Sequence, residues 1–185
     1  IKDRQGTMWI GTYFGGVNYF NPEYEIYTRY SAGASSASSL SFPVVGSMAE
    51  DDSGRLWICT EGGGLNILDR RTGRFSRFPA ITTANLKALY FDRKRGVMWV
   101  GSHLGGLYRI DIASGHVTTY RHLRGNHHSL PSDVVRSIVP YGDKLVIGMM
   151  TGAALFDPNK GADDGFTRLL PDRIRLAVSS ICVDH

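Results

Sequence analysis

Short runs of apolar, β-branched and aromatic residues follow one another along the chain, separated by turns rich in Gly. Asp-x-x-Gly, Gly-Gly and Thr-Gly sequences bound these runs, and this punctuation is typical of short strands. No stretch keeps apolar residues at the i, i+3, i+4, i+7 positions long enough to form a helix. The pattern predicts two successive groups of four strands, at 44–51, 55–60, 65–69 and 75–78, and again at 86–92, 98–102, 107–111 and 117–120.

The strand pattern repeats four times at intervals of about 45 residues, a period typical of propeller blades and helical solenoids. The segments beginning at Gly6, Gly54, Gly96 and Gly142 share one frame, although the fourth has Val146 where the others have Trp. Four short strands per unit predict an all-β fold, a β-propeller of four-stranded antiparallel blades. The expected repeats are 1–43, 44–85, 86–133 and 134–176, with 177–185 starting the next blade.

Three sets of repeated residues have structural interpretations. A tight hairpin between the second and third strands needs Gly, which adopts a positive φ at little cost. A Trp that recurs in the second strand is expected to pack between neighbouring blades. An Asp that ends the third strand is expected to cap the following turn. These sets are Gly16, Gly64 and Gly106; Trp9, Trp57 and Trp99; and Asp69, Asp111 and Asp157.

The chain begins and ends in the same phase of the repeat. Residues 1–3 match 49–51, and 182–184 match them as well, so four repeat lengths are present. Four blades could close on themselves, but rings of six to eight blades are more common, and an uncapped terminal repeat exposes an apolar face. We therefore expect the chain to form part of a larger ring of seven or eight blades, or to pair with a second copy.

Composition and charge exclude several classes of protein. Hydrophobic residues make up 42% of the 185 residues, which excludes a disordered polymer. No apolar run is long enough to span a membrane as a helix, and an export signal, if present, is expected upstream of Ile1. The net charge of +4 comes from scattered basic residues, so nucleic-acid binding is not expected. Cys59 and Cys182 are expected to be buried free thiols.

The loops joining the second and third strands are expected on the same face of each blade as the connections between blades. Loops held by a rigid scaffold commonly carry binding residues. Aromatic side chains can stack on the C–H faces of sugars, and polar groups can orient the hydroxyls. The expected connections are 31–41, 81–85, 122–132 and 172–174. The candidate ligand-binding residues on this face are Tyr13, Phe14, Glu61, His103, Arg124, Asn126 and His127.

Five of the six histidines fall in or just after the third repeat, but their spacing does not favour a metal site. His127 and His128 are adjacent, and consecutive side chains of an extended chain point apart. His116 is expected on the face opposite His103. We therefore predict no metal site and no cofactor.

The recurring motif Asp-x-x-Gly-x-x-Trp-Ile-Gly-Thr-x-x-Gly-Gly-Leu resembles the two-component regulator propeller repeat, and the stretch 126–138 is similar to the segment that joins its blades. This resemblance covers essentially the whole chain. It implies a periplasmic sensor domain of a hybrid two-component sensor kinase, extracytoplasmic in an inner-membrane protein. Such domains control the transcription of polysaccharide-use genes. The implied partners are an oligosaccharide ligand, the remaining blades of the receptor and a second copy in a homodimer.

Two alternative functions remain open. The first is a lyase of the type that opens streptogramin antibiotics, which would need a catalytic His, carboxylates and a metal at the ring centre. The repeats do not present that set, so we expect no catalytic residues in this chain. The second is a protein-interaction scaffold of the WD-repeat kind, although the Trp-Asp dipeptide that ends the third strand in those repeats is missing.

Overall fold

The computed structural model of the protein describes residues 1–21, 26–33, 37–161, 164–169 and 177–182. The described chain is built of antiparallel strands, with no helix among these residues. It divides into two compact units, residues 1–86 and 87–185, which are described separately. No helix in the described ranges has the length and apolar character needed to cross a membrane.

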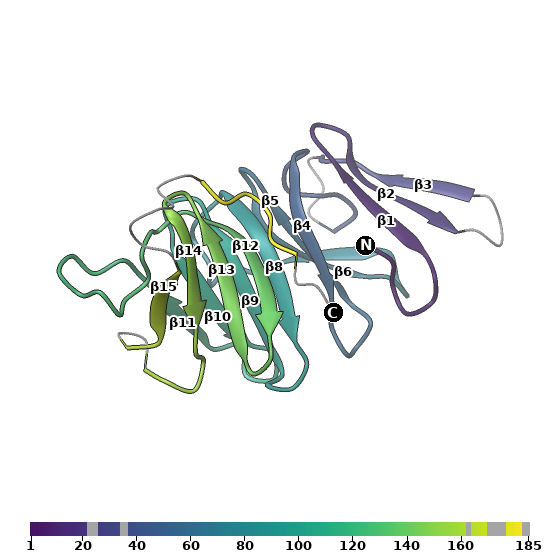
Figure 1. Cartoon of the computed structure of the whole chain (residues 1–185). Coiled ribbons are helices and arrows are strands. Elements are labelled where there is room, and N and C mark those ends of the chain that lie inside the picture. The colour runs from purple at the N-terminus through teal and green to yellow at the C-terminus, as the bar shows by residue number, and fades with distance from the viewer. Residues whose placement is uncertain (22–25, 34–36, 162–163, 170–176, 183–185) are drawn as a thin grey trace. The chain divides into compact units, whose positions relative to one another are not determined.

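The first unit contains two sheets (Figure 1). The first sheet has three strands in sequence order: β1 (Met8–Thr12), β2 (Gly16–Asn21) and β3 (Ile26–Tyr30). The second sheet has four strands, also in sequence order: β4 (Val45–Glu50), β5 (Leu56–Thr60), β6 (Gly64–Asp69) and β7 (Arg74–Arg77).

The second unit also contains two sheets, each with four strands in sequence order (Figure 1). The third sheet comprises β8 (Leu86–Asp92), whose first residue belongs to the first unit, β9 (Val97–Ser102), β10 (Leu107–Asp111) and β11 (Val117–Tyr120). The fourth sheet comprises β12 (Val135–Tyr141), β13 (Lys144–Met149), β14 (Gly152–Phe156) and β15 (Phe166–Leu169).

The predicted propeller fold is therefore confirmed, with each meander corresponding to one blade. The strand predictions between residues 44 and 120 agree with the observed bounds to within one residue. The first sheet differs from the others because it has three strands, and only residues 1–3 begin a fourth, through the bridge between Lys2 and Met8.

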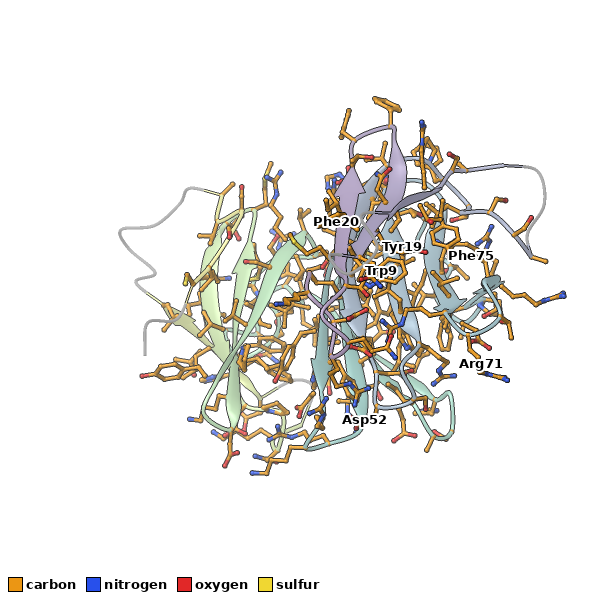
Figure 2. All side chains as sticks on the ribbon, turned by 90° about the vertical axis from the view of Figure 1, so that its right-hand side faces the viewer. Trp9, Tyr19, Phe20, Asp52, Arg71 and Phe75 are labelled. Carbon is orange, nitrogen blue, oxygen red and sulfur yellow. The ribbon has the colours of Figure 1, made fainter. Side chains whose placement is uncertain are left out.

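The two sheets of each unit pack face to face through apolar side chains. In the first unit Trp9 and Val17 of the first sheet lie in one cluster with Leu56 and Ile58 of the second. Figure 2 labels Trp9, Phe75 and Tyr19; Phe75 belongs to the same cluster, and the partly buried Tyr19 packs against it. Burial of large apolar groups between sheets is the main stabilising contribution expected for such a fold.

The core of the second unit repeats this arrangement. Trp99 is fully buried. Its ring centroid lies 5.5 Å from that of Phe156, and the two rings meet edge to face. Leu145 and Ile147 of the fourth sheet belong to the same cluster and occupy the repeat positions of Leu56 and Ile58. The inter-sheet contact is therefore made in the same way in both units.

One expectation about the cysteines is wrong. Cys59 is buried in β5, as predicted, but Cys182 is exposed. Its segment, residues 177–182, has the sequence of an inner strand but is not itself a strand among the described residues. The predicted blade connection 172–174 lies outside the described residues.

Candidate ligand-binding loop face

In the first unit, backbone hydrogen bonds join the hairpin loops to the connections between blades. The amide of Gly16 donates to Pro43 over 3.1 Å, so the β1–β2 loop lies against the connection that enters β4. In the second sheet, Gly62 and Gly64 both donate to Ala84, at 3.1 and 2.9 Å. Hairpin loops and connections therefore share one end of these sheets, which we call the loop face.

The second unit has an equivalent loop face. The amide of Gly106 donates to the carbonyl of Asp133 over 2.9 Å, and the Asp133 carboxylate accepts from the amide of His122 over 2.8 Å. In the fourth sheet, Met150 donates to Val134 over 3.1 Å. Because these bonds fix the backbone, the loop tips project from a rigid support.

The β1–β2 loop presents two exposed aromatic side chains. Tyr13 is 71% exposed and Phe14 is 66% exposed. Their rings meet edge to face with centroids 4.6 Å apart, a favourable geometry for an aromatic pair. The pair forms an apolar surface that remains open to solvent and is suited to stacking on a ligand.

Phe14 and Leu104 adopt a backbone conformation that side chains of their size rarely adopt. Phe14 has a φ of 90° and Leu104 a φ of 68°, and these two residues occupy the same position of the hairpin loop. The second blade has Gly62 at this position. Holding a non-Gly residue at positive φ costs about 1–2 kcal/mol, and strain of this kind clusters at functional sites. Leu104 is 66% exposed, so burial of its side chain does not offset the strain.

The remaining candidates are divided between the two units. Glu61 lies in the β5–β6 loop of the first unit, where its amide donates to Val44 over 2.9 Å. His103 precedes Leu104 in the β9–β10 loop of the second unit. The last three candidates belong to the connection between β11 and β12, in which Ser129 is buried: Arg124, Asn126 and His127.

The connection between β11 and β12 has a defined local structure. The Ser129 hydroxyl donates to the carbonyl of Asn126 over 2.8 Å and accepts from the amide of Leu123 over 3.0 Å. Arg124 and His127 are exposed on the outside of this turn. The structure thus places Arg124, Asn126 and His127 in one turn of the second unit's loop face.

No cluster of three or more His, Cys, Asp or Glu side chains able to hold a metal ion occurs among the described residues. His103 and His116 lie at opposite ends of β10, because one precedes the strand and the other follows it. The prediction that the chain has no metal site stays a prediction.

The acidic residues that end the third strand of each blade bind the turns that follow. Asp69 accepts from the amide of Arg71 over 2.9 Å, and Asp157 accepts from the amide of Asn159 over 3.1 Å. Asp111 accepts from both the amide and the hydroxyl of Ser114, and these hydrogen bonds lower the pKa of its carboxyl. All three lie at the end of the sheets opposite the loop face.

Sequence reasoning missed a second set of structural carboxylates. Asp3 and Asp51 each lie six residues before a Trp and accept a hydrogen bond from its indole nitrogen over 2.8 Å. In the third blade the turn is one residue longer, and the buried Trp99 indole nitrogen has no hydrogen-bond partner. The fixed spacing from Asp to Trp in the first two repeats could have revealed the bond.

An ionic cluster links the two blades of the first unit. Arg70 extends from the β6–β7 turn to the carboxylates of Asp3 and Glu50, with an N–O distance of 2.5 Å to Glu50. Its guanidinium also lies 5.8 Å from the centre of the Trp9 ring. A concavity of about 590 Å³ adjoins this cluster and is also lined by Gln5 and Arg71. It lies at the end opposite the loop face and contains none of the predicted ligand-binding residues.

Comparison with known proteins supports the interpretation of the repeats. Residues 39–62 match the family model described as two component regulator propeller. These residues include β4, β5 and the loop of the second blade. A search of curated proteins finds no match.

Solved structures share the fold over most of the chain. The extracellular domain named as the hybrid two component system BT3049 from B. thetaiotaomicron is 26% identical over 90% of this chain, with a TM-score of 0.73. That of BT4673, named as a one component system from the same organism, is 22% identical over 94%, with a TM-score of 0.75. Virginiamycin B lyase from Staphylococcus aureus is 13% identical over 91%, with a TM-score of 0.66, which shows the fold alone.

The chain is much shorter than these proteins. It spans 22% of the BT3049 chain, 25% of the BT4673 chain and 53% of the lyase. Residues 39–62 thus match the two component regulator propeller model, and the chain shares its propeller fold with the extracellular domains of such regulatory systems.

Proposed function

We propose that this chain is part of the extracytoplasmic ligand-sensing region of a hybrid two-component sensor kinase, and that it binds oligosaccharides released from polysaccharides through its loop face. The proposal makes the chain a binding domain without catalytic residues of its own. The signal would pass to the rest of the receptor because ligand favours one of its conformations over another.

The observation that carries the proposal is the exposed aromatic pair of the β1–β2 loop. Tyr13 and Phe14 stand outside the core, and Phe14 keeps its strained backbone although Gly would relieve it. A purely structural loop would favour Gly at this position, as in the second blade. Aromatic faces bind the C–H patches of sugar rings, so this chemistry fits a glycan ligand.

The test is calorimetric titration with oligosaccharides released from xylan, mannan, arabinan, fructan and pectin, using the complete extracytoplasmic region and this chain side by side. We expect saturable binding to one member of the panel. A double variant, Tyr13→Ala with Phe14→Gly, should weaken that binding at least tenfold while the melting transition stays intact. His103→Ala tests the loop face of the second unit in the same assay.

The matched control is Tyr141→Ala, because Tyr141 is also an exposed Tyr, 57% accessible, but lies at the opposite end of its sheet. This control should bind like the unaltered protein. Unchanged affinity in the double variant and in His103→Ala would place the ligand elsewhere. A flat response across the whole panel would argue against a glycan and for a protein or other ligand.

A further inference from the structure

Two hairpin loops of the loop face each bind an Arg side chain through a backbone carbonyl. In the first unit the Nε of Arg29, in β3, donates to the carbonyl of Gly15 over 3.0 Å. In the second unit the Nη1 of Arg121, which follows β11, donates to the carbonyl of Leu104 over 2.7 Å. The β1–β2 loop and the β9–β10 loop are thus each fixed to a guanidinium from the outer strand of the same sheet.

These two loops are also the ones that have a strained backbone. Phe14 directly precedes Gly15 and has a φ of 90°, and Leu104 has a φ of 68°. In the second blade Gly62 occupies this loop position, where a positive φ costs little. Strain of this kind persists where the surrounding structure holds it, and it clusters at ligand-binding sites. Strain and a bound guanidinium therefore occur together in the first and third blades.

The second blade shows a different use of the same Arg where the loop is relaxed. Arg77 aligns with Arg29, since each lies opposite an Asn of the neighbouring strand. Arg77 donates to the side chain of Asn66 and, over 2.8 Å, to the carbonyl of Ser39. Arg77 is thus partly buried and serves the fold, whereas Arg29 is exposed.

The two loop guanidiniums keep N–H groups that a ligand can reach. Arg29 uses its Nε, so both Nη groups remain, and no acidic side chain in the described part of the chain forms an ion pair with it. Arg121 is 48% exposed and uses its Nη1, which also lies 3.5 Å from the Asp133 carboxylate, so its Nε and Nη2 remain. Two neighbouring N–H groups of a guanidinium match two oxygens of a carboxylate or of a similar oxyanion.

The sequence around both loops favours an anionic ligand. Residues 12–16 of the β1–β2 loop include no Asp or Glu. In the connection between β11 and β12, residues 122–128 include Arg124 and three histidines, and Asp133 is the one acidic residue between Arg121 and β12. An acid group that approaches either loop therefore meets guanidinium charge with little competing negative charge.

We propose that these two loops bind the acid groups of the ligand, so that the loop face recognises acidic oligosaccharides, whose rings carry a carboxylate or a sulfate. In the first unit Tyr13 and Phe14 contact the face of a sugar ring, and Arg29 binds its acid group. In the second unit Leu104 supplies the apolar contact, and Arg121 binds the acid group. This inference rests on the proposed function, because it names the class of sugar that the loop face takes.

The first experiment compares ligands that differ only in charge, by calorimetric titration of the complete extracytoplasmic region. Trigalacturonate carries a carboxylate on each ring, and its methyl ester has the same rings without the charge. A sulfated oligosaccharide released from carrageenan, paired with its desulfated form, distinguishes sulfate from carboxylate. We expect one of the two acidic ligands to bind at least about tenfold more tightly than its uncharged form.

The outcomes separate this inference from the proposed function. Saturable binding of neutral xylan or mannan oligosaccharides, with no response to either acidic ligand, would overturn the inference and leave the proposed function standing. Equal affinity for an acidic ligand and its uncharged form would do the same. A flat response to every oligosaccharide would overturn both.

Two variants test the guanidiniums directly. Arg29→Gln and Arg121→Gln should each weaken binding of the acidic ligand at least about tenfold. The matched controls are Arg71→Gln in the first unit and Lys160→Gln in the second. Each control removes one exposed positive charge from a turn at the end opposite the loop face, and Figure 2 labels Arg71. Both controls should bind like the unaltered protein.

The comparison with the controls makes the result specific to the loops. Unchanged affinity in both loop variants would overturn the proposal. Equal losses of affinity in the loop variants and in the controls would also overturn it, because they would indicate a general effect of net charge. Near-UV circular dichroism verifies that each variant remains folded.

Discussion

The hydrogen bond between Asp51 and Trp57 offers the sharpest test of what holds a blade together. The Asp51 side chain is 1% exposed, and its carboxylate accepts from the indole nitrogen of Trp57 over 2.8 Å and from the Nε of Arg55 over 2.7 Å. It also accepts from the amides of Ser53 and Arg55, at 2.9 and 3.0 Å. One buried carboxylate thus satisfies four donors in a single turn.

Replacing Asp51 with Ala leaves the Trp57 indole nitrogen without a partner in a site where the ring is 2% exposed. A buried polar group left unsatisfied costs about 1–3 kcal/mol. The amides of Ser53 and Arg55 can bind water instead, so the loss of their hydrogen bonds to Asp51 adds about 1 kcal/mol. We therefore expect Asp51→Ala to lower the free energy of unfolding by about 2–4 kcal/mol.

Asp92 is the matched control, because it occupies the equivalent position of the third blade but does not bind Trp99. It accepts from the amide and the guanidinium of Arg95, at 3.2 and 2.9 Å. Asp92→Ala should cost about 1–2 kcal/mol, since no buried indole nitrogen loses a partner. The difference between the two losses of unfolding free energy measures the contribution of the hydrogen bond from the Trp57 indole nitrogen to Asp51.

Because the chain has two compact units, a single global transition need not report both blades. Native-state hydrogen exchange of the β5 and β9 amides measures each blade separately. Asp51→Ala should reduce the protection of β5 by at least 1 kcal/mol more than Asp92→Ala reduces that of β9. Equal losses of protection in β5 and β9 would refute the view that the indole hydrogen bond stabilises the blade.

Three further predictions use other features. Leu104→Gly should raise the stability of the second unit by about 0.5–1 kcal/mol in urea denaturation, because relief of the positive φ exceeds the added entropy of the unfolded chain; a loss of stability would contradict the strain. Arg70→Ala should cost about 3 kcal/mol because it removes the mostly buried guanidinium that binds the carboxylates of Asp3 and Glu50, whereas Lys94→Ala, whose ion pair is exposed, should cost less than about 0.5 kcal/mol; similar losses of stability in thermal melts would contradict this ranking. Hydrogen bonds from Ser114 lower the pKa of Asp111, so its stabilisation is present above the ordinary Asp pKa and lost as pH falls through the lower folded value. Asp111→Asn should therefore be less stable than the unaltered protein at neutral pH and equally stable in strong acid, and a constant difference across the acid range would contradict the assignment.

Local pattern was sufficient to predict the strands and their order. Runs such as Leu56–Thr60 and Val97–Ser102 carry β-branched and aromatic residues between Gly-rich turns, and these preferences act over a few residues. The repeat then implied that neighbouring sheets pack through the same positions. The hairpin glycines followed from the same reasoning, since Gly16, Gly64 and Gly106 all have positive φ.

The candidate site was harder to predict because it depends on properties that a pattern does not contain. The sequence pointed to Tyr13 and Phe14, but their exposure and the φ of Phe14 come from the hairpin geometry. In the sequence Arg70 is only one of two adjacent basic residues in a turn, and the packing of two blades brings it to Asp3 and Glu50.

The sequence by itself determined the all-β fold, the four repeats and the end of each blade that carries the hairpin loops, because these depend on propensities and spacings within about 45 residues. The tertiary structure decided which surfaces remain open. Met8 occupies the repeat position of the fully buried Leu56, yet the side chain of Met8 is 46% exposed. Identical patterns differ in exposure because burial depends on whether another blade lies alongside, and that is a property of the assembled sheets.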